Sequence, residues 1–120
     1  PWANVCTDGG IINRHPRSFG SYPRILGRFV REEDLLPLEE AVRKMTSLAA
    51  TNMGFDDRGL VREGMAADLV LFDPETVIDH ATPLEPDLLS TGIRSVWVNG
   101  EVVFRDGAAT EARPGRVIRR

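Results

Sequence analysis

An aspartate at position 8 is the first residue of this sequence suited to acid–base chemistry. It follows a short run, Pro1 to Cys6, whose apolar, aromatic and β-branched residues predict a strand, and it precedes Gly9 and Gly10. A carboxylate at the end of a strand is held rigidly, and two glycines beside it allow a substrate to approach closely. Asp8 is therefore a candidate general base. The same spacing fits an aspartate that only caps a turn, and the residues alone leave both roles open.

A basic motif, His15-Pro16-Arg17, follows in the segment after Asp8. A guanidinium can grip a carboxylate through two parallel hydrogen bonds, and a proline before it stiffens the loop. Arg17 is therefore a candidate anion-binding residue, with His15 as its neighbour in the loop. A solvated loop arginine gives the same pattern, so this alternative also stays open.

The sequence offers few metal ligands. Its two histidines, His15 and His80, are far apart, and its one cysteine, Cys6, stands close to the negative charge of Asp8. Because the histidines lack the spacing of a metal site, a metal centre built from this chain alone is not predicted. Cys6 is expected to be a small buried residue rather than a nucleophile, since the nearby carboxylate disfavours its thiolate.

A long loop and several helical segments are predicted to position these residues. Residues 9–23 hold glycines and prolines without a helical or strand period, which predicts a functional loop. The apolar residues that follow recur at helical spacing. Gly27 weakens the first helix by about 1 kcal/mol relative to alanine, whereas Pro37 and Gly54 fit the start and the end of the later helices. The predicted helices are 24–33, 38–49 and a further turn over 47–53.

Strands dominate the sequence after residue 54. The clearest local signal is Asn99-Gly100 between two β-rich runs, which predicts a hairpin with a type I′ turn because both residues accept positive φ. Residues 74–92 predict a connecting loop. Neither half of the chain has enough elements to close a barrel or a sandwich, so both are expected to need partner structure. The predicted strands are 59–61, 67–73, 95–98 and 101–105.

The composition limits the classes of partner. The chain has 120 residues, a net charge of −3 and a single cysteine, so it is at most one soluble domain without the basic surface needed to bind nucleic acid or an anionic membrane. No apolar run approaches the ~18 residues of a membrane span, and no targeting segment is visible. These features predict a cytoplasmic protein. Any anionic partner is expected to bind to a few local residues rather than to a generally basic surface.

Motifs spread along nearly the whole chain carry a resemblance to a known family. They lie at 6–10 (Cys-Thr-Asp-Gly-Gly), 14–20 (Arg-His-Pro-Arg-Ser-Phe-Gly), 23–28 (Pro-Arg-Ile-Leu-Gly-Arg), 38–47 (Leu-Glu-Glu-Ala-Val-Arg-Lys-Met-Thr-Ser), 64–73 (Gly-Met-Ala-Ala-Asp-Leu-Val-Leu-Phe-Asp) and 98–100 (Val-Asn-Gly). Together they resemble the C-terminal quarter of D-aminoacylases, the N-acyl-D-amino-acid deacylases of the amidohydrolase superfamily. The last two motifs are shared widely across amidohydrolases, whereas the Arg-His-Pro-Arg loop and the Pro-Arg-Ile-Leu-Gly run point to the D-aminoacylase branch.

The resemblance implies a fold and a zinc chemistry. In that family a distorted TIM-type barrel holds one or two zinc ions in its mouth, and a small β domain is assembled from both ends of the chain. Residues 1–54 would then be the last strand, substrate loop and helices of the barrel, and 55–120 part of a small β-sandwich domain, an α/β fragment overall. Asp8 matches the aspartate that activates a metal-bound water and protonates the leaving amine. Arg17 matches the arginine that grips the α-carboxylate of an N-acyl-D-amino acid, and His15 shares this substrate-binding loop without an implied role of its own.

The zinc ligands that the family implies all lie upstream of this chain. The resemblance therefore implies that the chain is the C-terminal portion of a hydrolase and is inactive alone. Its apolar strand and sheet edges are expected to associate with the remainder of that polypeptide or with another copy. Two alternatives stay open, namely another amidohydrolase, such as a dihydroorotase- or hydantoinase-like cyclic amidase, and a non-catalytic β-rich module.

Overall fold

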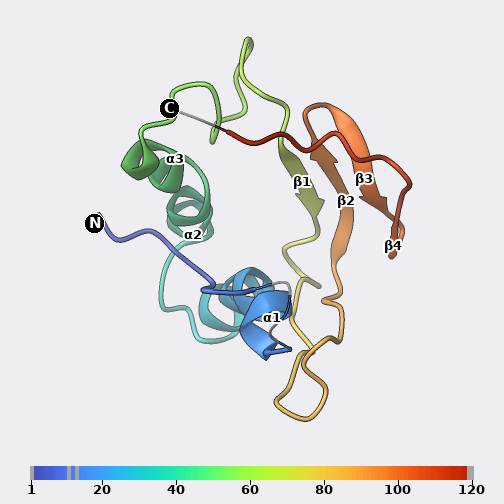
Figure 1. Ribbon diagram of the computed structural model, residues 1–120. Coiled ribbons are helices and arrows are strands. Elements are labelled where there is room, and N and C mark those ends of the chain that lie inside the picture. The colour runs from blue at the N-terminus through green and yellow to red at the C-terminus, as the bar shows by residue number, and fades with distance from the viewer. Residues whose placement is uncertain (1, 11, 13, 119–120) are drawn as a thin grey trace.

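The computed structural model describes residues 2–10, 12 and 14–118. Helices lie on one side of the molecule and an antiparallel sheet on the other (Figure 1), which confirms the α/β prediction at this coarse level. Pro1 of the predicted strand and both Ile11 and Asn13 of the predicted loop fall outside the described residues. Within the described ranges, no helix combines the length and hydrophobicity that crossing a bilayer requires.

Two consecutive helices begin within the basic motif and continue beyond it. They are α1 (Pro16–Arg24) and the π-helix η1 (Ile25–Glu32). The predicted loop over 9–23 is therefore wrong from Pro16 onward. The helix predicted over 24–33 is confirmed, although its backbone is a π-helix and it continues directly from α1.

Two prolines explain why α1 escaped prediction. Pro16 stands at the start of the helix, where its missing N–H costs nothing, and His15 caps the helix before it. Pro23 lies inside the helix, where it cannot donate a hydrogen bond to the carbonyl of Phe19. The hydroxyl of Ser90 donates to that carbonyl instead, at 3.3 Å. A contact from a distant part of the chain thus compensates for the proline, and no local pattern reports it.

The next two helices follow the sequence pattern closely. They are α2 (Leu38–Met45), which Pro37 precedes, and α3 (Ser47–Met53), which Gly54 ends in the left-handed conformation at φ 73°. The continuous helix predicted through this region is wrong at Thr46, where φ −128° and ψ −92° leave the helical range. Acidic residues in the first turn of α2 and basic residues in its last turn suit the helix dipole.

The sheet is an antiparallel meander in the order β1-β2-β3-β4. Asn99 and Gly100 have φ of 48° and 82°, so the predicted type I′ hairpin turn is confirmed. Asp106 and Gly107 repeat this geometry, with φ of 52° and 84°, and add a short fourth strand that the sequence analysis missed. The strands are β1 (Leu69–Phe72), β2 (Ile93–Val98), β3 (Glu101–Arg105) and β4 (Ala108–Ala109).

The hairpin turn at Asn99 and Gly100 is hydrogen-bonded to the residues that precede β1. The backbone N–H of Asn99 donates to Oδ1 of Asp68 at 2.8 Å, and that of Gly100 donates to the carbonyl of Ala67 at 3.0 Å. The other carboxylate oxygen of Asp68 lies 2.7 Å from Nη1 of Arg58. Two motifs that stand far apart in the sequence therefore form one unit at this end of the sheet.

Two predicted strands are wrong. Residues 2–10 contain no strand: they pass beside α2, where the N–H of Val5 donates to the carbonyl of Lys44 at 3.1 Å. A helix end offers a single carbonyl rather than the ladder of groups that a strand needs. In residues 59–61, Gly59 has φ 90°, which a strand does not use, and residues 59 and 60 form bends.

The β1–β2 connection, residues 73–92, joins the sheet to the helices. It is largely irregular, as predicted, and Val77 within it is fully buried against Leu26 of η1 and Ala41 of α2. The core therefore lies where this connection meets the helices. Partly buried side chains from both sides pack around it: Ile25, Val30, Leu36, Leu38, Val42, Met45, Phe72 and Ile93.

Candidate functional site

The two charged residues singled out in the sequence lie side by side. Nη2 of Arg17 is 3.1 Å from Oδ2 of Asp8, and the side chains are 43% and 84% exposed, respectively. An ion pair this exposed contributes little to stability. Its importance is geometric, because it places a carboxylate and a guanidinium at one accessible point of the surface.

A close backbone approach holds Asp8 beside α1. Asp8 itself has φ 47°, and the next N–H, from Gly9, donates to Oγ1 of Thr7 at 3.0 Å. A Cβ atom on Gly9 would lie 3.0 Å from Cα of Ser18 in the first turn of α1. Only glycine leaves the Asp8 loop free to rest on this turn without a shift, and the turn also carries Arg17.

His15 organises the start of the same helix. Its Nδ1 accepts a hydrogen bond from the backbone N–H of Arg17 at 3.2 Å, and its backbone is extended, as a residue at the N-cap requires. Nδ1 can accept only while it carries no proton, so the neutral ring with the proton on Nε2 is the form that caps. No role could be assigned to His15 from the sequence, and in the structure it caps the helical turn that carries Arg17.

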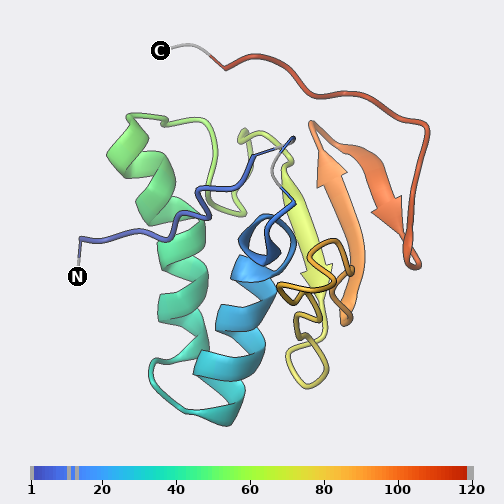
Figure 2. The ribbon, with the colours of Figure 1, turned by 60° about the horizontal axis from the view of Figure 1, so that its bottom comes forward.

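The described residues do not form a metal site. Within residues 2–10, 12 and 14–118, no three His, Cys, Asp or Glu side chains come close enough together to hold an ion. Cys6 is exposed, so the prediction that it is buried is wrong. The segment that carries it passes over the helices at the surface (Figure 2), and its main-chain contacts leave the thiol uncovered.

An ion pair between the half-exposed Arg24 of α1 and the buried side chain of Asp79 has no sequence signal. Oδ2 of Asp79 accepts hydrogen bonds from Nε and Nη2 of Arg24 at 3.0 and 2.8 Å, and the side chain of Asp79 is only 5% exposed. The partners stand 55 positions apart in the sequence. A single aspartate in a loop carries no spacing pattern, which is why sequence reasoning missed it.

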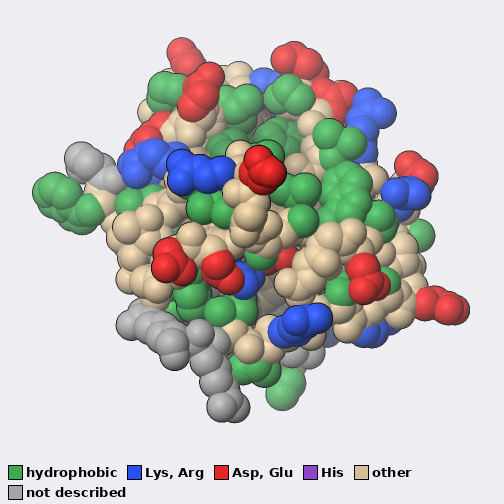
Figure 3. All heavy atoms as spheres, turned by 90° about the horizontal axis from the view of Figure 1, so that it is seen from above, with side chains coloured by type: hydrophobic (Ala, Val, Ile, Leu, Met, Phe, Trp, Pro, Cys, Tyr) green, Lys and Arg blue, Asp and Glu red, His purple; other side chains and the backbone are tan. Residues whose placement is uncertain are grey.

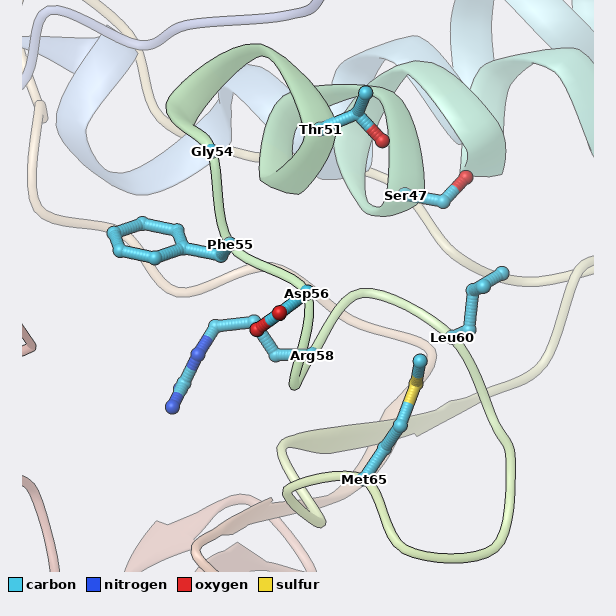
Figure 4. Close-up of a pocket in the computed structure, with 8 residues that line it drawn as sticks. All are labelled: Ser47, Thr51, Gly54, Phe55, Asp56, Arg58, Leu60 and Met65. Atoms are coloured by element: carbon cyan, nitrogen blue, oxygen red, sulfur yellow. The ribbon is translucent and has the colours of Figure 1, made fainter. Parts of the chain in front are cut away.

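A concave region lies apart from Asp8 and Arg17, which are not among its lining residues. It is an open hollow between α3 and the loop that follows, with Ser47 and Thr51 contributed by the helix (Figure 4). Arg58 on its rim is already paired with Asp57 and Asp68. The hollow contains none of the candidate residues from the sequence. Its lining is Ser47, Thr51, Gly54, Phe55, Asp56, Arg58, Leu60 and Met65.

Comparison with known proteins gives a consistent group of relatives. N-acyl-D-aspartate deacylase from Alcaligenes xylosoxydans xylosoxydans is 52% identical over 121 residues, which cover 98% of this chain and 24% of the relative. A crystal structure of D-aminoacylase matches with a TM-score of 0.86 and 49% identity, over 88% of this chain and 22% of that one. N-acyl-D-glutamate deacylase from Bordetella bronchiseptica, solved with zinc and a phosphonate mimic of the tetrahedral intermediate, matches with a TM-score of 0.81 and 52% identity over the same shares.

The chain spans about a quarter of the length of these relatives. The model of the amidohydrolase family matches residues 3–104, which include the Asp8 loop, the helices and most of the sheet. The chain therefore belongs to the amidohydrolase family.

Proposed function

We propose that this chain is the C-terminal part of an enzyme that hydrolyses N-acyl-D-amino acids to a carboxylate and a D-amino acid. The support from relatives is specific, since those at 49 to 52% identity are deacylases of D-amino acids or D-aminoacylase. The motifs that first suggested this family run along the same length of chain.

The observation that carries the proposal is the contact between Asp8 and Arg17. In an N-acyl-α-amino acid, the carboxylate and the amide nitrogen are bonded to the same carbon atom. A residue that binds the carboxylate must therefore stand next to the residue that delivers a proton to the amide nitrogen. Side chains 3.1 Å apart meet this requirement.

In the proposed reaction, Asp8 moves one proton. Its carboxylate takes a proton from water as the water oxygen attacks the amide carbonyl carbon. The same proton then passes to the amide nitrogen as the carbon–nitrogen bond breaks, which releases the acyl group as a carboxylic acid and the D-amino acid as a free amine. The carboxylic acid then loses its proton and the amine takes one up, so the final products are a carboxylate and an ammonium group. Asp8 ends the cycle as a carboxylate, so no further reactant is needed.

Arg17 binds the α-carboxylate through charge-assisted hydrogen bonds. The substrate carboxylate replaces Asp8 as the partner of the guanidinium and leaves Asp8 free to accept the proton. His15 holds the backbone of Arg17 at the N-cap of α1 and thereby fixes the start of the side chain. The chirality of the substrate and the preference for its side chain depend on groups outside this chain.

Zinc enters this proposal through the relatives, one of which is solved with it. The described residues do not bring three candidate ligands together, and the proposal places the zinc ligands upstream of this chain because the family resemblance implies it. No step assigned above to Asp8, Arg17 or His15 depends on the position of the metal.

The two halves of the chain take different places in the proposed enzyme. Residues 1–54 form the end of a TIM-type catalytic barrel, with the substrate loop and helices, and 55–120 form strands of a small β domain. This division is supported by the change from helices to antiparallel strands after Gly54.

The test is the substitution Asp8→Asn in the complete polypeptide that this proposal requires. The variant is expected to lower kcat for N-acetyl-D-amino acids by about 10²- to 10⁴-fold, because the proton carrier is lost. Amine release from a panel of N-acetyl-D-amino acids, their L-forms and cyclic amides measures this. Full activity of Asp8→Asn would defeat the assignment, and a preference for cyclic amides would favour a dihydroorotase- or hydantoinase-like enzyme.

A further inference from the structure

The β1–β2 connection contacts the Arg17 helix near both of its ends. Before the helix, Nη2 of Arg14 forms an ion pair with Asp87. Inside the helix, the hydroxyl of Ser90 donates to the carbonyl of Phe19, which Pro23 leaves without its usual donor. A segment that joins two strands of the sheet therefore supplies hydrogen bonds that α1 cannot make within itself.

Asp79 makes the contact with the more buried carboxylate, since its side chain is 5% exposed and that of Asp87 is 47% exposed. Oδ2 of Asp79 accepts two N–H groups of the Arg24 guanidinium, at 3.0 and 2.8 Å. Gly20, which is buried, lies against the same side chain: a Cβ atom at this position would be 2.8 Å from Cβ of Asp79 and 3.0 Å from its Oδ2. Asp79 thus packs against α1 at Gly20 and accepts hydrogen bonds from Arg24 at the end of the helix, so it restrains α1 at two positions.

Arg17 is on the helix face that Asp79 contacts. Positions 17, 20 and 24 are related by the i, i+3, i+7 spacing of one helix face. At 1.5 Å per residue, Arg17 is only ~5 Å along the axis from Gly20. A shift of α1 at Gly20 therefore moves Arg17 by a similar distance, whereas the segment that carries Asp8 is also hydrogen-bonded to α2, through the N–H of Val5 and the carbonyl of Lys44.

We propose that Asp79 is a positioning residue for substrate recognition. Through Arg24 and Gly20 it sets the position of Arg17 relative to Asp8, and so controls how well the site distinguishes a substrate with an α-carboxylate from one without it. This inference rests on the proposed function and extends it to a residue of the β1–β2 connection. Asp79 touches neither Asp8 nor Arg17 directly and acts only through the helix.

The experiment compares two substrates in the complete polypeptide. One is an N-acetyl-D-amino acid and the other is its primary amide, which lacks the α-carboxylate. For Asp79→Asn, the ratio of kcat/KM between acid and amide is expected to fall by about 10- to 100-fold, mostly through KM for the acid, because a misplaced arginine binds carboxylate poorly. A merely structural role would lower kcat/KM for both substrates together, and that result would overturn the proposal.

Three variants sharpen the comparison. Glu85→Gln removes an exposed charge from the same connection and is expected to leave the ratio unchanged. Arg24→Lys keeps the positive charge but loses the two-donor geometry, so it is expected to lower the ratio less than Asp79→Asn does. It also keeps the test decisive if Asp79→Asn fails to fold, since an unchanged ratio in Arg24→Lys overturns the proposal. In an Arg17→Ala background, Asp79→Asn is expected to cause no further loss, and additive losses would contradict it.

The outcomes separate this inference from the proposed function. If the unmodified polypeptide hydrolyses no N-acyl-D-amino acid, both fall. If it hydrolyses them and Arg17→Ala lowers the ratio while Asp79→Asn leaves it unchanged, the proposed function stands and the role of Asp79 is overturned.

Discussion

The backbone of Asp8 adopts a conformation that few residue types tolerate. Its φ of 47° lies in the left-handed region, where aspartate and asparagine are favoured over other non-glycine residues. Asp8→Asn therefore removes the charge and keeps the loop, whereas Asp8→Ala would add backbone strain as well. Loss of activity in the asparagine variant reports on the carboxylate alone, provided that its thermal unfolding matches that of the unmodified protein.

Arg17→Lys tests how the site binds an anion. Lysine keeps the charge but cannot form the paired hydrogen bonds of a guanidinium, so KM for N-acetyl-D-amino acids is expected to rise about tenfold, with a smaller change in kcat. Steady-state kinetics on the complete polypeptide measure both constants, with Arg62→Lys, an exposed arginine away from the site, as control. A fall in kcat at constant KM would mean that Arg17 acts in the transition state only.

Residue types pointed to part of the candidate site, and the roles of these residues stay predictions. Asp8 and Arg17 could be named because each belongs to a motif with a recognisable order of residues. The cap role of His15 could have been predicted from the sequence. Proline is favoured at the first position of a helix, so Pro16 marks the residue before it as the N-cap. The contacts of Asp79 could not be predicted from the sequence, because Arg24 and Gly20 meet it only in the folded chain.

Among the elements, those fixed by local chemistry were predicted best. The turn at Asn99-Gly100 and the end of α3 at Gly54 each depend on residues that accept positive φ, and both were found at the expected positions. Helix α1 depends instead on Ser90, which replaces a donor that Pro23 lacks. Local propensity favours a loop there, and the tertiary contact overrides it.

Gly27 gives a test in which propensity and packing disagree. Helix propensity alone predicts that Gly27→Ala stabilises η1 by about 1 kcal/mol. In the structure, a Cβ atom at this position would collide with the carbonyl oxygen of Val77 and lie 2.6 Å from Cδ1 of Ile78. Gly27→Ala is therefore expected to lower the free energy of unfolding by about 1–3 kcal/mol.

Thermal or urea unfolding of the chain, followed by circular dichroism, measures this change. Gly115→Ala is the matched control, because nothing lies within 4 Å of a Cβ atom there. A variant at position 27 that is more stable than the parent would show that the β1–β2 connection can move away from η1 at low cost.

The molecule as a whole exposes more surface than its mass predicts. Its accessible surface is 8565 Å², whereas a compact monomer of 13.3 kDa has roughly 6,500 Å². Its radius of gyration is 14.5 Å, against about 13.6 Å for a compact chain of this length. Hydrophobic side chains lie in groups between charged ones on the face that Figure 3 shows. Surface of this kind is typical of a chain that packs against other protein.

The isolated chain is therefore expected to associate with itself. β1 is an edge of the sheet, and its Val70 and Leu71 are 55% and 51% exposed, which leaves both backbone groups and apolar side chains open to pairing. Sedimentation velocity over a range of concentrations is expected to show association, and Leu71→Lys to reduce it. A monomer at every concentration that unfolds cooperatively would contradict this expectation.

The Asn99-Gly100 turn is also, by its sequence, a site prone to deamidation. Asparagine followed by glycine deamidates readily, because the glycine nitrogen attacks the asparagine side-chain carbonyl and forms a succinimide. Here the N–H of Gly100 is bound to the carbonyl of Ala67, and Nδ2 of Asn99 donates to the carbonyl of Pro114 at 2.7 Å. Because both the attacking nitrogen and the departing amide are hydrogen-bonded, we expect this turn to deamidate more slowly in the folded sheet than in the unfolded chain.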